Sequence, residues 1–257
     1  MGKSNSALIK LFSGTSPEIN IFVHGFRSIN TIEKLENLAY NILHAKPSGQ
    51  VYLYAWKSDI NFNSEAISNL ILLVAKSKNQ YVSTISLLSP ILSIYARFKF
   101  YESRAAILGE NLKRHISKIP GAKDLNIYLI GHSLGALVIF NALTANDWFD
   151  YNIKDIVLIG GCVDKNSSLW EDVIDQISGN IYNGYSIDDK ILKKTPDFKK
   201  HIGRNKLLIN TYYNNRIINH EFPSYSHSDY WPNLEEVLFN LWDNFIISNE
   251  YDVDENL

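Results

Sequence analysis

A serine between two glycines is the residue of this chain best placed for covalent chemistry. Residues 131–136 read Gly-His-Ser-Leu-Gly-Ala and separate two apolar runs, at 125–130 and 136–143. The first run is short and rich in β-branched residues, which predicts a buried strand, and the second has apolar residues at helical spacing. A Gly-x-Ser-x-Gly turn between a strand and a helix is a nucleophile elbow, which presents a serine hydroxyl to a carbonyl carbon. Ser133 is therefore the expected nucleophile.

A histidine late in the chain is the expected base, because a serine hydroxyl attacks only when a neighbouring group takes its proton. In folds built on this elbow the acid follows the serine, and the histidine follows the acid. His227 lies between the last predicted strand and the last predicted helix, where the base belongs. His220 lies in the same predicted loop and is the alternative, whereas His201 precedes the last predicted strand.

The acid that holds this base should follow a strand between the serine and the histidine. Asp189 comes directly after the predicted strand at 180–186 and is the expected acid. Its neighbour Asp188 and the earlier Asp164, which follows the preceding strand, are the alternatives. Short carboxylates that are not the acid are expected to cap a helix or lie in a loop.

Two backbone N–H groups are needed to stabilise the oxyanion that forms during attack. Leu134 directly follows the nucleophile and supplies the first. The second is expected from Phe26, in a loop after the second predicted strand, because Gly25 lets that loop turn its amides inward. We expect His24 and His132 to support the site through hydrogen bonds rather than to transfer protons.

The elements that must position these residues alternate along the chain. Apolar patterns predict strands at 7–12, 19–23, 51–56, 125–130, 153–159, 180–186 and 207–213. They predict helices at 30–44, 64–119, 136–143, 166–177 and 234–247, with a loop at 214–228. This alternation predicts an α/β fold with a mostly parallel central sheet and helices on both faces. A single domain is expected over 1–247, followed by an acidic, frayed tail at 248–257.

The helical insertion at about 64–101 is longer and more apolar than packing on the sheet requires. Four roles are open for it: a cap or lid over the site, a peripheral membrane contact, a dimer face, or additional buried core. Oligomeric state is not determined by the sequence.

Composition excludes several classes of function. The formal net charge of −2 argues against a nucleic-acid partner, and a single cysteine rules out an internal disulfide or a cysteine-based metal site. No cofactor or metal is expected. The sequence shows neither an apolar signal region nor an uninterrupted span of ~20 apolar residues. A cytoplasmic location is expected, with delivery as a secreted effector by a signal-independent route as the alternative.

The elbow, the His-Gly loop, the late aspartate and the late histidine occur in the order this chemistry requires, and with them residues 19–247 resemble the α/β-hydrolase superfamily. The chain also resembles the poorly characterised hydrolase family of transmembrane-and-coiled-coil-domain proteins. Four segments carry this likeness: Tyr-Ala-Trp-Lys-Ser at 54–58, the elbow, Leu-Ile-Gly-Gly at 158–161, and Tyr-Ser-Ile-Asp-Asp-Lys-Ile-Leu at 185–192. The family's pattern implies that Asp189 is the acid and favours His227.

The chain departs from that family in two ways. It lacks the family's membrane-spanning helices, and Gly161-Cys162 stands where a small residue and a proline are usual. The resemblance implies lipase-like or esterase-like chemistry, with a lipid or phospholipid ester as the expected substrate. The alternatives are a catalytically silent scaffold that binds protein or lipid, and a thioesterase or acyltransferase that uses the same three residues.

Overall fold

The computed structural model describes residues 6–25, 32–56, 85–195, 197, 199–209, 212–243 and 245–247. Within them, seven strands form one sheet in the order β1-β3-β2-β4-β5-β6-β7. They are β1 (Ser6–Ser13), β2 (Glu18–Val23), β3 (Gln50–Trp56), β4 (Asn126–His132), β5 (Asn152–Ile159), β6 (Ile181–Tyr185) and β7 (Ile217–Glu221). Every neighbouring pair is parallel except β1 with β3.

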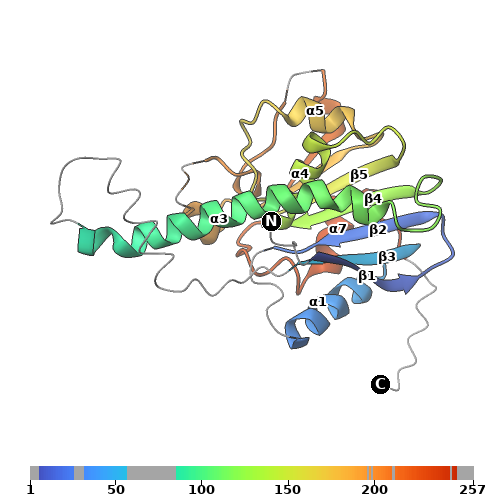
Figure 1. Cartoon of the computed structure of the whole chain (residues 1–257), viewed down its shortest axis with the longest axis horizontal. Helices are drawn as coiled ribbons and strands as arrows, with labels where there is room; N and C mark the ends of the chain where they lie inside the picture. The colour runs from blue at the N-terminus through green and yellow to red at the C-terminus, as the bar shows by residue number, and fades with distance from the viewer. Residues whose placement is uncertain are drawn as a thin grey trace.

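Helices cover both faces of this sheet (Figure 1). On one face lie α3 (Ile85–Ile116), α4 (Leu134–Ala145) and α5 (Trp170–Asp175), and on the other lie α1 (Ile32–His44) and α7 (Leu234–Leu241). A one-turn helix, α6 (Lys190–Lys193), follows β6. Alternate residues of each strand enter the two cores: Ile21 and Val23 face α4, whereas Phe22 faces α7. The predicted α/β class, with helices on both faces, is confirmed.

The order of the strands brings three distant segments to one edge of the sheet. The chain leaves β2 for β3 on one side, and β4 lies on the other side of β2. Val23 at the end of β2 pairs with Gly131 on β4, and His132 pairs with Ile159 at the end of β5. Ligands bind where a parallel sheet reverses its winding in this way. The predicted His-Gly loop and nucleophile therefore meet at this point.

The predicted last strand at 207–213 is wrong, because the last strand is β7, inside the segment predicted as a loop. The side-chain amide of Asn219 on β7 accepts from the Leu207 N–H at 2.7 Å and donates to its carbonyl at 3.0 Å. Leu207 is thus hydrogen-bonded like a strand residue, but by a side chain. Leu207 is buried, Leu208 is 66% exposed, and Ile209 and Tyr213 pack partly buried on the same core, so the described part of this run contains one fully buried residue.

Two predicted helices are shorter than their apolar patterns. The helix predicted at 166–177 is formed only over α5, Trp170–Asp175. Before it, the Asp164 carboxylate accepts the Asn166 N–H at 3.0 Å and holds the chain in a turn. The closing helix ends at Leu241, because Trp242 is extended and its indole N–H donates to the buried Asp155 carboxylate at 3.0 Å.

Residues 64–84 of the predicted helical insertion lie outside the described residues. The whole predicted acidic tail at 248–257 and residues 26–31 also lie outside them. What is described of the insertion belongs to α3. Among the helices that the structure describes, none combines the length and apolar character that crossing a bilayer requires.

Candidate active site

Ser133 lies in a strained turn between β4 and α4, as the elbow motif predicts. Its φ is 57° and its ψ is −120°, a conformation that non-glycine residues rarely adopt. The Ser133 N–H donates to the Ile159 carbonyl at 3.1 Å, which fixes the turn to β5. A Cβ on Gly135 would lie 2.0 Å from the Val23 carbonyl oxygen, so only glycine lets α4 begin this close to β2. The turn presents the hydroxyl at the edge of the sheet.

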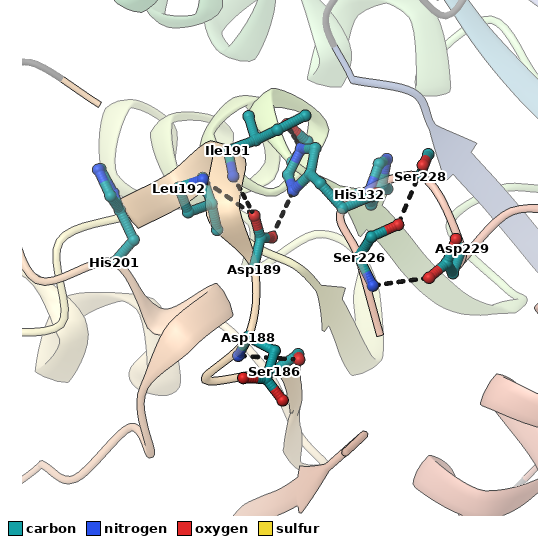
Figure 2. Close-up of polar contacts among 12 residues, drawn as sticks. His132, Ser186, Asp188, Asp189, Ile191, Leu192, His201, Ser226, Ser228 and Asp229 are labelled. Atoms are coloured by element: carbon teal, nitrogen blue, oxygen red, sulfur yellow. Dashed lines mark hydrogen bonds and ion pairs between the residues drawn. The ribbon is translucent and has the colours of Figure 1, made fainter. Parts of the chain in front are cut away.

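His227 lies between Ser133 and Asp189. Its Nε2 is 2.7 Å from the Ser133 Oγ, and its Nδ1 is 2.6 Å from an Asp189 carboxylate oxygen. An ionised carboxylate only accepts hydrogen bonds, so Nδ1 carries the proton and Nε2 accepts from the serine hydroxyl. The other Asp189 oxygen accepts the N–H groups of Ile191 and Leu192, each at 2.9 Å, and caps α6 (Figure 2). Asp189 is completely buried, so its orientation is fixed from two sides.

The alternative residues lie elsewhere. Asp188 is exposed, and its carboxylate accepts the Ser224 N–H at 3.2 Å, while Figure 2 places it beside Ser186. The Asp164 carboxylate forms the turn before α5. His220 is on β7 rather than in the predicted loop, and its ring packs on Phe222 at 4.6 Å.

Of the predicted oxyanion site, the structure describes Leu134 and the first two residues of the loop after β2, His24 and Gly25. Leu134 is the first residue of α4, and N–H groups in a first helical turn have no partner within the helix. A Cβ on Gly25 would lie 2.8 Å from the Ser133 Cβ, so this glycine lets the loop pass directly beside the nucleophile. Phe26, the predicted second donor, lies outside the described residues.

His24 fixes this loop and is fully buried. Its Nε2 accepts the Trp56 N–H at 3.1 Å, so its Nδ1 carries the proton and donates to the Gly25 carbonyl at 2.7 Å. Its ring stacks on the Trp56 indole at 5.0 Å. Burial lowers the pKa of His24 to about 4, so the ring is neutral at physiological pH. Sequence reasoning did not predict this contact of Trp56, the last residue of the strand beside β2.

Acid should destabilise the fold through His24. In the unfolded chain a histidine titrates near a pKa of about 6.5, whereas the folded His24 has a pKa of about 4. Between these values the unfolded state binds the extra proton, so stability falls as the pH falls. The loss from His24 is about 3 kcal/mol across this window. Urea unfolding of wild type and His24→Gln, at about pH 7 and about pH 4.5, should show a smaller loss in the variant. Equal losses would contradict this assignment.

His132 joins the elbow to the segment that carries the base. Its Nε2–H donates to the His227 backbone carbonyl at 3.0 Å, and the two rings lie 4.8 Å apart. The side chain is buried, and burial together with the neighbouring His227 holds its pKa well below the usual range. Because His132 directly precedes Ser133, one stretch of backbone fixes both the nucleophile and its base.

Cys162 explains one departure from the resembled family. Its N–H donates to the Ser133 carbonyl at 3.0 Å, a bond that a proline at this position would remove. The thiol is buried, and burial raises its pKa, so Cys162 is an unreactive thiol at physiological pH. His201 is buried near Thr195 and Asp197, with its Nε2 2.9 Å from the Thr195 Oγ1, and takes no part in the contacts of Ser133, His227 and Asp189.

Over the described part of the chain, no group of three or more histidine, cysteine or carboxylate side chains is placed to hold a metal ion. The strand order, the strained elbow and the serine–aspartate–histidine order together define an α/β-hydrolase fold. The α/β-hydrolase fold that the sequence predicts is confirmed.

Part of the chain is similar to a protein family of unassigned function. A family model described as "Protein of unknown function (DUF726)" matches residues 84–195. An uncharacterized membrane protein of Caenorhabditis elegans is 29% identical over 189 residues, which cover 70% of this chain and 29% of that protein. This chain therefore corresponds to less than a third of the length of that relative.

Solved structures with a similar arrangement have little sequence in common with this chain. A predicted CIB-like hydrolase from Thermoplasma acidophilum is 12% identical, with 91% of this chain and 88% of that one covered and a TM-score of 0.48. A lipase-esterase related protein from Clostridium acetobutylicum is 13% identical, with 94% and 99% covered and a TM-score of 0.45.

Proposed function

We propose that this chain is a serine hydrolase that cleaves carboxylic esters through an acyl-enzyme intermediate. The observation that carries the proposal is His227, whose two ring nitrogens lie 2.7 Å from the Ser133 Oγ and 2.6 Å from the Asp189 carboxylate. Nucleophile, base and acid in contact, on a strained elbow, form the arrangement that activates a serine.

Each residue has a defined part in the proposed reaction. The Ser133 Oγ bonds to the ester carbonyl carbon while His227 Nε2 takes its proton, and the carbonyl oxygen becomes an oxyanion. The Leu134 N–H, and by proposal the Phe26 N–H, stabilise that charge. The carbon–oxygen bond to the alcohol breaks as His227 returns the proton to the alcohol. Water, activated by His227, then releases the carboxylic acid and restores Ser133. Asp189 holds the imidazole in the required tautomer throughout.

A lipid or phospholipid ester is the proposed substrate class. This part rests on the apolar sequence at 66–96, of which 66–84 lies outside the described residues. A thioesterase or acyltransferase would use the same three residues with a different leaving or accepting group. A catalytically silent scaffold would not require the hydrogen bond between the Ser133 hydroxyl and His227.

Turnover of p-nitrophenyl esters of increasing acyl length, with a thioester and an acyl acceptor alcohol in parallel, tests this proposal. We expect wild type to hydrolyse the esters, with the Ser133→Ala protein as the matched control. A greater rate on the thioester, or transfer to the alcohol in place of hydrolysis, would reassign the reaction. Absence of turnover by folded wild type on every substrate would favour the scaffold.

A further inference from the structure

A basic and apolar surface lies on both sides of Asp189 in the sequence. We name it the α6 surface and define it as Ile187, Lys190, Ile191, Lys193 and Lys194, all of which are exposed. The two isoleucines are 54% and 58% exposed, so apolar and basic side chains lie together in one exposed segment. Three lysines, two in α6 and one at its C-cap, lie within five consecutive residues and form a local positive region in a chain whose net charge is −2.

Among the described residues of the α6 surface and its neighbours, positive charges outnumber exposed carboxylates. The exposed carboxylate within it, Asp188, accepts the Ser224 N–H at 3.2 Å. The neighbouring Asp189 is completely buried against His227. The Arg204 guanidinium donates to the Ile187 carbonyl at 2.5 Å, which adds a further positive charge next to this residue.

The α6 surface is also attached rigidly to the active site. The Asp189 carboxylate caps α6 with one oxygen and contacts His227 with the other. Leu192 is buried on the inner side of α6, whereas Ile191 points outward next to the capped N–H. Figure 2 shows the N–H groups of Ile191 and Leu192 converging on one oxygen of the Asp189 carboxylate. A ligand bound to α6 therefore lies next to Asp189, which contacts the proposed base His227.

We propose that the α6 surface docks the protein on an anionic lipid surface, so that the proposed hydrolase acts on esters within a membrane. Lysines ringed around exposed apolar side chains are typical of interfacial binding, because the cations pair with lipid phosphates while the apolar groups enter the acyl boundary. A nucleic-acid backbone would match the lysines but would leave the isoleucines in water. The substrate part of this inference rests on the proposed function, but the docking part does not.

Vesicle cosedimentation of the full chain tests the docking, with Ser133→Ala as the background so that no lipid is cleaved. We expect binding to vesicles of phosphatidylcholine with phosphatidylserine, and weak binding to phosphatidylcholine alone. K190Q/K193Q/K194Q should lower the partition coefficient on the order of 100-fold, since each lysine near an anionic surface contributes a roughly fivefold factor. The control K10Q/K118Q/K123Q removes the same charge from exposed lysines elsewhere and should bind like the parent protein.

A second variant separates lipid from other anions. I187S/I191S should weaken vesicle binding roughly tenfold, because apolar burial is lost, and should leave any binding to duplex DNA unchanged. Equal binding to both kinds of vesicle, no binding to either, or the same loss in both lysine variants would overturn the proposal. DNA binding that exceeds vesicle binding would overturn it as well. If the protein binds vesicles but wild type hydrolyses no ester, the docking proposal stands and only the proposed function is refuted.

Discussion

Replacing Ser133 with alanine should lower kcat for ester hydrolysis on the order of 10⁶-fold, because the reaction loses its nucleophile. The Oγ accounts for the contact with His227 at 2.7 Å, and the alanine methyl cannot form it. The fold should persist, since the Ser133 N–H and carbonyl contacts with Ile159 and Cys162 come from the backbone. Initial rates on a p-nitrophenyl ester, together with a urea unfolding curve, measure both quantities.

The two measurements together decide what a loss of activity means. An inactive variant that unfolds at the same urea concentration as wild type supports a chemical role for Ser133. A variant that keeps more than about a hundredth of the wild-type rate would show that another group attacks the ester. Ser133→Cys is the companion variant, since a thiol keeps a nucleophile at the same position.

Replacing Asp189 with asparagine should lower kcat on the order of 10⁴-fold and change stability far less. The asparagine carbonyl can still accept the N–H groups of Ile191 and Leu192 and cap α6. Its NH₂ group would then face His227 Nδ1, which favours the tautomer with the proton on Nε2. A histidine in that tautomer cannot accept the serine proton.

Asp189→Ala is the matched comparison, because it removes the cap as well as the contact with His227. It should be as inactive as Asp189→Asn and in addition less stable, by about 1 kcal/mol for the cap alone. Steady-state kinetics and urea unfolding of both variants distinguish the two roles. If Asp189→Asn keeps most of the activity, a different residue orients His227.

The position of the nucleophile could be predicted because the elbow is defined by neighbouring residues. The elbow needs glycine on both sides of the serine within one turn, so its signal lies in five consecutive residues. Asp189 could be predicted because it follows β6, whose apolar pattern is clear. His227 follows β7, which the pattern missed, so its prediction depended on its place before the closing helix. The position of the elbow between β4 and α4 follows from the same local signals.

Contacts between distant residues that belong to no motif could not be predicted. The last strand was misplaced because β7 contains Asn219, His220 and Glu221, whereas the more apolar run before it is held by the Asn219 side chain. The roles of Trp56 and of the His132 hydrogen bond depend on pairs separated by 32 and 95 positions. No spacing within the sequence reports such pairs.

Reaction with a fluorophosphonate, followed by intact-mass and peptide mass spectrometry, tests the central claim that His227 and Asp189 activate Ser133. The account predicts a single adduct per wild-type chain, located on the peptide that contains Ser133. It predicts no adduct on Ser133→Ala and much slower labelling of Asp189→Asn. Folded wild-type protein that stays unlabelled, or an adduct that persists in Ser133→Ala, would contradict it.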